Sequence, residues 1–195
     1  MMKRSKKNIV KKIMPAIWAA LIICLSFLLD NVLIRLINVT QYPLLFNFFY
    51  AITLLGESYV FIWIALFLIV ALMINRRPII ALISSMATVA ILEVALKAII
   101  QRPRPFEVMS INNTVTTNMS SFPSGHAMIF FSIIPIMSKN FPKIKTVLWI
   151  VAILVGMSRI YLGVHYFSDV VAGAIFGYAI GWTFMKLGEK YEWKS

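Results

Sequence analysis

Long apolar runs dominate this sequence and restrict the folds that are open to it. Six segments approach the roughly 20 apolar residues that a helix needs to cross a bilayer. They are 13–29, 58–74, 79–100, 124–138, 146–161 and 170–187. Because 61% of the 195 residues are hydrophobic and only 13% are charged, a soluble globule of this size could not bury its apolar surface. The sequence therefore predicts an all-α integral membrane protein, a six-transmembrane-helix bundle that forms one domain over 1–195.

The segments and their connections are uneven in length. The fourth and fifth segments are short, so we expect their ends to lie inside protein rather than lipid. Between the first two, apolar stretches are interrupted by Asp30, Arg35, Asn38, Gln41, Pro43 and Glu57. This pattern predicts one or two interfacial amphipathic helices over 30–57 instead of a seventh crossing. Residues 101–123 form the longest polar loop.

The net charge of +12 would suggest a nucleic-acid partner in a soluble protein, so its placement decides its meaning. Six spans put most Lys and Arg residues on one side of the membrane. Fourteen of the 19 lie there: Lys3, Arg4, Lys6, Lys7, Lys11, Lys12, Arg76, Arg77, Lys139, Lys143, Lys145, Lys186, Lys190 and Lys194. The positive-inside rule predicts that this side, with both termini, is cytoplasmic. The surplus charge thus sets orientation, and no nucleic acid is expected as a partner.

Three of the five remaining basic residues suggest a phosphate site on the outer side. These are Lys97, Arg104 and Arg159, and the other two are Arg35 and Arg102. An arginine fork matches phosphate oxygens, and lysine acts as a point charge. Ser124 and Gly125 stand at the start of the fourth segment, where free backbone N–H groups of a helix favour an anion. Together these residues predict a phosphate cradle.

The two histidines of the chain, His126 and His165, lie in the same outward clusters. His165 and Asp169 are four residues apart, so on a helix they would share a face and could form a hydrogen bond. A carboxylate that holds one imidazole nitrogen leaves the other free to attack phosphorus. His126 is then the group suited to protonate the departing oxygen.

These motifs together resemble a known family. The pattern Lys-x6-Arg-Pro (97–105), Pro-Ser-Gly-His (123–126) and Ser-Arg-x5-His-x3-Asp (158–169) is similar to the three signature motifs of the type-2 phosphatidic acid phosphatases. The resemblance implies a membrane lipid phosphate phosphatase that needs no metal and no cofactor. It implies that His165 is the nucleophile, Asp169 its support and His126 the general acid. It also implies that the phosphate is bound by Lys97, Arg104, Ser124, Gly125 and Arg159.

Two further residues lie beside these motifs. Arg102 falls outside the Lys-x6-Arg spacing and is interpreted as a spare cation that could help bind a diphosphate or a headgroup. Glu93 precedes Lys97 by one helical turn, so we expect the two to pair inside the bundle.

The identity of the substrate is the least constrained prediction. The extra cation Arg102 favours a polyprenyl diphosphate such as undecaprenyl diphosphate, with phosphatidylglycerol phosphate and phosphatidic acid as alternatives. A second class of function also remains open, because three cations could bind a phosphate lipid for passage in a transporter or other non-enzymatic protein. That class has no need of a His165–Asp169 pair together with His126, so the sequence favours the enzyme.

Overall fold

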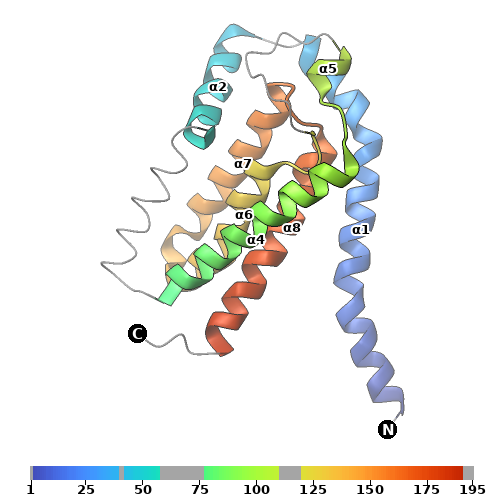
Figure 1. The fold of residues 1–195 in the computed structure, drawn as a ribbon, viewed down its shortest axis with the longest axis vertical. Coiled ribbons are helices and arrows are strands. Elements are labelled where there is room, and N and C mark those ends of the chain that lie inside the picture. The colour runs from blue at the N-terminus through green and yellow to red at the C-terminus, as the bar shows by residue number, and fades with distance from the viewer. Residues whose placement is uncertain (1, 40–41, 58–76, 110–119, 191–195) are drawn as a thin grey trace.

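The computed structural model describes residues 2–39, 42–57, 77–109 and 120–190. Within these ranges the chain is helical, with short turns between the helices. The α-helices are α1 (Met2–Val39), α2 (Pro43–Glu57), α4 (Arg77–Ile100), α5 (Pro105–Met109), α6 (Gly125–Asn140), α7 (Lys145–Tyr161) and α8 (Phe167–Lys190), and a 3₁₀ turn, η1 (Pro142–Ile144), joins α6 to α7. As Figure 1 shows, α6 and α8 lie in the middle, flanked by α4, α7 and α1.

Among the residues that the structure describes, four segments are long and apolar enough to cross a bilayer, where the sequence predicted six in the whole chain. They are Ile13–Ile37, Pro78–Val108, Pro142–Tyr161 and Phe167–Lys190. The expected span 124–138 corresponds to α6, whose 16 residues extend only about 24 Å against a hydrocarbon core of about 30 Å. The expected span 58–74 lies outside the described residues. The described chain is therefore an all-α membrane bundle with four candidate spans.

The expected break after the first span is wrong. α1 continues without interruption through Asp30 and Arg35 to Val39, because Asp30 is buried and paired inside the protein and so does not force the chain out of the membrane. In the described part of 30–57, α2 is the separate helix that follows α1, and its place at the membrane interface stays a prediction. It packs on α7, where Phe49 lies 4.8 Å from Tyr161 between ring centroids.

Three glycines on one face of α8 allow it to approach α6 closely. Gly173, Gly177 and Gly181 recur every four residues, so they line a single stripe. The backbone of α6 occupies the space that larger side chains would need. A Cβ on Gly177 would meet the Met128 carbonyl, and one on Gly181 would meet the Ser132 carbonyl. Small residues at such spacing are the usual means of close helix contact in membranes. This stripe fixes the start of α6 against the start of α8.

We expect Gly177→Ala to destabilise the bundle. The new methyl group would collide with rigid backbone at Met128, and overpacking of this kind costs about 1–3 kcal/mol. The thermal unfolding midpoint in detergent should fall by several degrees, because a loss of this size in unfolding free energy lowers the midpoint by that amount. The matched control is Ala179→Leu on an exposed position of α8, which should leave the midpoint unchanged. Equal midpoints for all three proteins would contradict the close contact.

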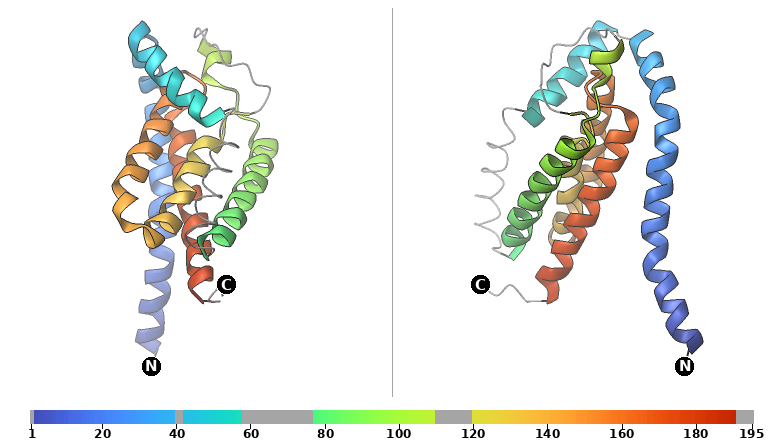
Figure 2. Two further views of the ribbon diagram at one scale, coloured as in Figure 1. Left: turned by 90° about the vertical axis from the view of Figure 1, so that its left-hand side faces the viewer. Right: turned by 45° about the vertical axis from the view of Figure 1, so that its right-hand side comes forward.

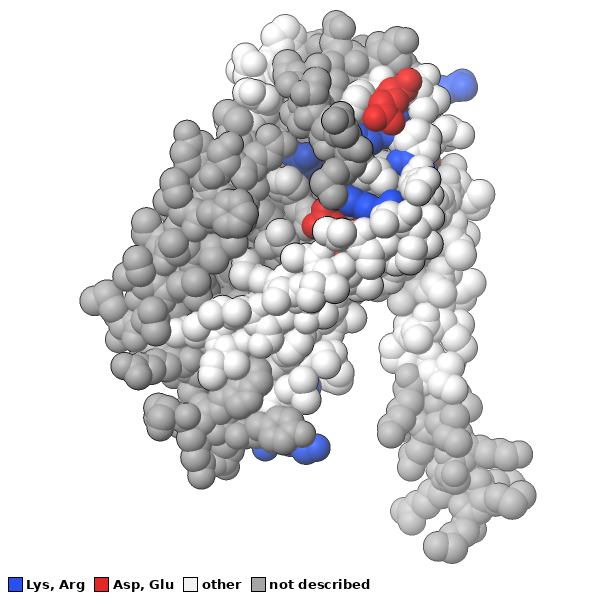
Figure 3. All heavy atoms as spheres, in the orientation of Figure 1, with Lys and Arg blue, Asp and Glu red and all other residues white. Residues whose placement is uncertain are grey.

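The helix directions place the two ends of the described chain at the same end of the bundle. α1 begins and α8 ends at the bottom of Figure 1, where the turn between α6 and α7 also lies. Figure 2 shows that α6 (left view) and α8 (right view) start in the upper part of the bundle, away from the end where α1 begins. In Figure 3, charged side chains on the visible face gather around a recess in the upper part, with a separate basic group at the lower end.

Candidate functional site

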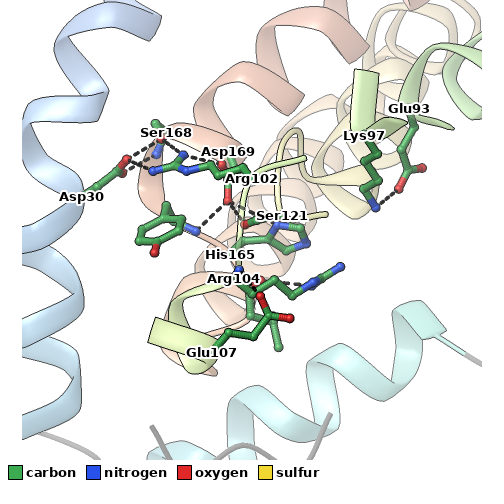
Figure 4. A network of polar contacts seen from close by, with 12 residues as sticks. Asp30, Glu93, Lys97, Arg102, Arg104, Glu107, Ser121, His165, Ser168 and Asp169 are labelled. Carbon is green, nitrogen blue, oxygen red and sulfur yellow. Dashed lines mark hydrogen bonds and ion pairs between the residues drawn. The ribbon is translucent and has the colours of Figure 1, made fainter. Parts of the chain in front are cut away.

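Polar side chains from sequence-distant motifs meet where α4 ends, α6 begins, α7 ends and α8 begins (Figure 4). Most of them are buried, with at most 8% of the surface exposed. This group comprises Lys97, Arg104, Ser124, Arg159, His165 and Asp169. Burial of so many ionisable groups in a membrane bundle is costly and typical of a functional site. The structure thus brings the three predicted clusters together.

His165 lies in the turn before α8, not on the helix that its spacing from Asp169 suggested. The N–H of His165 donates to the Arg159 carbonyl at 3.1 Å, which folds residues 162–165 back over the end of α7. Gly163 permits this turn because its φ of 68° is in the left-handed region. His165 Nδ1 lies 3.5 Å from Asp169 Oδ2, and it makes no hydrogen bond within the described part of the chain.

Asp169 is fully buried in the first turn of α8 and is surrounded by donors. Its Oδ2 accepts a hydrogen bond from the Tyr166 N–H at 2.9 Å and another from the Ser121 hydroxyl. Its Oδ1 accepts one from Arg102 Nη1 at 2.6 Å. The carboxylate is therefore held in one orientation, with Oδ2 toward His165.

The start of α6 lies beside the His165–Asp169 pair. The Ser124 N–H donates to the Asp169 carbonyl at 3.1 Å, which ties the two helix starts together. The Ser124 hydroxyl is buried and makes no hydrogen bond within the described part of the chain. Gly125 is the first residue of α6, and His126 follows, half-buried, in the same turn. Backbone N–H groups and a hydroxyl are thus gathered at a helix start that favours an anion.

A carboxylate already lies against this helix start. Glu93 binds Lys97 Nζ at 2.5 Å, so the pairing expected from their spacing is confirmed. The same carboxylate fills the space where a Gly125 side chain would be. Lys97 and the start of α6 therefore accommodate an anionic group between them in this structure.

Arg104 and Arg159 complete the cationic side of the site. Arg104 Nη1 donates to the Val164 carbonyl at 3.0 Å, which holds the guanidinium against the turn that carries His165. Both side chains are 3% exposed. A buried arginine keeps its charge and its forked geometry, so the two provide fixed donors beside His165.

Arg102 is not the spare cation that the sequence suggested. Its Nη2 binds Asp30 at 2.8 Å, and its Nη1 binds Asp169 at 2.6 Å and Ser168 Oγ at 2.7 Å. Both terminal nitrogens are therefore bonded to protein. The physical reason is the buried carboxylate on α1, which the sequence alone could not place near residue 102. Arg102 thus gives no support to a diphosphate substrate.

Sequence reasoning did not identify three of the polar residues at this site. Asp30 was interpreted only as the end of a span, and Ser121 and Ser168 were not singled out. Asp30 carried a usable signal, because an ionisable residue within an apolar helix is a functional candidate by default. The serines carried none, since small polar residues are common at helix starts.

The pKa of His165 is lowered from 6.5 to about 4, chiefly because burial disfavours the charged imidazolium. His165 is therefore neutral, as a nucleophile must be, throughout the physiological range. We expect the acid limb of kcat/KM that belongs to His165 to lie near pH 4. Burial of this neutral side chain should also lower the free energy of unfolding as the pH falls from 6.5 toward 4, because the unfolded chain binds the proton first.

Rates measured between pH 4 and 8 test this prediction. The phosphate of the substrate also titrates, so its own pKa has to be determined separately by phosphorus NMR. A His165 limb near 6.5, after the substrate titration is subtracted, would contradict the burial of the imidazole.

The helices are long enough to cross a membrane, and they hold buried cations and a histidine–aspartate pair at a helix start. These features are typical of a membrane protein that acts on phosphate esters. Comparison with known proteins gives the family. Residues 78–193 match the PAP2 superfamily, and the chain belongs to it. It is a multi-pass membrane lipid phosphate phosphatase, so the alternative of a non-enzymatic transporter falls away.

Individual relatives agree with this assignment. An undecaprenyl-diphosphatase from Sulfolobus acidocaldarius is 30% identical over 148 residues, which cover 74% of this chain and 71% of the relative. The crystal structure of Aquifex aeolicus LpxE superimposes with a TM-score of 0.74 at 33% identity, covering 81% of this chain and 95% of that one. A PAP2-type phosphatidylglycerolphosphate phosphatase from Bacillus subtilis shares the fold, with a TM-score of 0.71 at 24% identity over 91% and 96% of the two chains.

Proposed function

We propose that this phosphatase works without a metal, through a phosphohistidine intermediate on His165. The imidazole Nε2 attacks phosphorus, the bond from phosphorus to the leaving oxygen breaks, and His126 donates a proton to that oxygen. His126 then takes a proton from water, which attacks the phosphohistidine, releases inorganic phosphate and restores His165. The observation that carries this proposal is that His165 Nδ1 lies on the side of Asp169 Oδ2, 3.5 Å away, so that Nε2 is the nitrogen left to attack phosphorus.

The phosphate would be bound by Lys97, Arg104, Ser124, Gly125 and Arg159. The position of the Glu93 carboxylate supports this. It lies against Lys97 and Gly125, so an acidic oxygen group fits between these two residues. The buried Ser124 hydroxyl and the two arginines would stabilise the charge that grows on the equatorial oxygens during transfer.

For the substrate we propose a polyprenyl diphosphate of the undecaprenyl type. Arg102 no longer supports it, so the proposal rests on the Sulfolobus relative, which is named an undecaprenyl-diphosphatase. A phosphatidylglycerophosphatase or phosphatidic acid phosphatase is the second candidate, and the former is favoured by a Bacillus subtilis relative, 32% identical over 113 residues, that is named phosphatidylglycerophosphatase B. All of these lipids present the same phosphate to the cradle.

A phosphate-release panel separates the candidates. Undecaprenyl diphosphate, phosphatidylglycerol phosphate and phosphatidic acid are presented in detergent micelles to the purified protein, with and without EDTA. We expect release to persist in EDTA and to be fastest with undecaprenyl diphosphate. Loss of activity in EDTA that added Mg²⁺ restores would contradict the metal-independent mechanism. A preference for phosphatidic acid of about twentyfold, near 1.8 kcal/mol in transition-state binding, would overturn the substrate.

We further propose that both termini are cytoplasmic and that the site faces the extracytoplasmic side. The basic residues at the chain ends and in the turn between α6 and α7 support this orientation. A cysteine at Ser195, in a Cys24→Ser background, should react with a membrane-impermeant maleimide only after the cells are permeabilised. Labelling of intact cells would show that the C-terminus lies outside the cell and would contradict the proposed orientation.

A further inference from the structure

Asp30 is an anion in the middle of an apolar helix. It lies in the candidate span Ile13–Ile37 of α1 and is 3% exposed. Its carboxylate accepts hydrogen bonds from the Ser168 N–H at 2.8 Å, from the Ser168 hydroxyl at 2.5 Å and from Arg102 Nη2 at 2.8 Å. A buried carboxylate survives in such a place only when it is paired in this way. α1 lies outside the residues that match the PAP2 superfamily.

Arg102 joins this carboxylate to the site. Its guanidinium reaches Asp30 with one terminal nitrogen and Asp169 with the other. Its carbon lies 3.9 Å from the centre of the Tyr166 ring and 4.8 Å from that of Phe27. Two carboxylates and two aromatic rings therefore fix the position of this side chain, which is an arrangement that the planar fork of arginine suits and lysine does not.

The two oxygens of Asp169 have separate tasks in this chain of contacts. Arg102 holds Oδ1, while Oδ2 faces His165. The alternation of charge along Asp30, Arg102 and Asp169 matters as well. Without Asp30, the positive charge of Arg102 would act on Asp169 uncompensated. It would then oppose the positive charge that grows on His165 as the imidazole attacks phosphorus.

We propose that Asp30 is a positioning residue for the reaction. It holds and neutralises Arg102 so that Asp169 is aligned behind His165, and α1 thereby supplies a part of the machinery from outside the signature motifs. The inference rests on the proposed function of His165. It deepens that function by adding a residue that acts through two others and does not touch the phosphate.

The test compares Asp30→Asn with the unaltered full-length protein on undecaprenyl diphosphate and on phosphatidic acid in detergent micelles. We expect kcat to fall about 10- to 100-fold, the loss typical of outer-shell residues that orient metal ligands, with KM changed less than about twofold, because Asp30 lies on the far side of Asp169 from the cradle. The matched control is Ser26→Ala, one turn earlier on α1, whose buried hydroxyl bonds only to the Ile23 carbonyl among the described residues. It should keep full kcat.

A double-mutant cycle distinguishes positioning from general damage. Because Asp30 acts through Arg102, the pair Asp30→Asn and Arg102→Gln should be no slower than Arg102→Gln alone. Additive losses, or a normal kcat in Asp30→Asn with only a lowered unfolding midpoint, would overturn the inference. If Asp30→Asn fails to fold, Arg102→Lys is measured instead, because one ammonium group cannot bind both Asp30 and Asp169. A normal kcat in Arg102→Lys would then overturn the inference. An unaltered protein that is inactive on these two lipids and on phosphatidylglycerol phosphate would overturn the proposed function and, with it, this inference.

Discussion

Replacing His165 with asparagine is expected to abolish phosphate release, with a loss of at least about 10⁴-fold in kcat. The proposed attack on phosphorus needs the imidazole Nε2, which asparagine does not provide. The fold should survive the change, because the imidazole is neutral when buried and Asp169 keeps Arg102, Ser121 and the Tyr166 N–H as partners. An unfolding midpoint near that of the unaltered protein would confirm that the loss is chemical.

The intermediate itself provides the sharper measurement. Unaltered protein mixed with ³²P-labelled lipid and quenched in alkali should carry label on one histidine, since the phosphorus–nitrogen bond is stable there and breaks in acid. The asparagine variant should carry none. Label on His126, or normal turnover by the variant, would show that the nucleophile is misassigned.

Replacing His126 with asparagine is expected to have the second largest effect, and one that depends on the substrate. A general acid contributes about 10²- to 10⁴-fold when the leaving group is a poor one, as the alkoxide of a lipid phosphomonoester such as phosphatidic acid is. para-Nitrophenyl phosphate releases para-nitrophenolate, which departs without a proton, so phosphorylation of His165 by this substrate should slow far less in the variant. His126 lies in the first turn of α6, next to Gly125, and its role as general acid stays a prediction.

The comparison of the two substrates is the measurement. The ratio of single-turnover phosphorylation rates, unaltered protein over His126→Asn, should be large for a lipid phosphomonoester and close to one for para-nitrophenyl phosphate. Equal losses on both would mean that His126 binds phosphate or shapes the site instead of donating a proton. The variant should still form phosphoenzyme from para-nitrophenyl phosphate, and this makes it the matched histidine control for His165→Asn.

Short-range spacing proved sufficient to identify the candidate residues but not their surroundings. The pairing of Glu93 with Lys97 was predicted correctly, because one helical turn fixes their separation whatever the rest of the chain does. His165 and Asp169 are close to each other, but not because they share a helix face as their spacing suggested. His165 lies in a turn that is fixed by hydrogen bonds to the Arg159 carbonyl. Arg102 was misread because its partner stands 72 positions earlier in the chain.

The sequence by itself determined the membrane class, the family resemblance and the motif residues that meet at the site, but not Asp30, Ser121 or Ser168 beside them. Hydrophobicity and fixed spacing act locally along the chain, so they can be read without a structure. The tertiary structure decided that Asp30 is buried in an unbroken α1, that Arg102 bridges it to Asp169, and that Glu93 lies against Gly125. These contacts depend on which helices pack together, and a buried charge finds its partner only once the packing has excluded water from both.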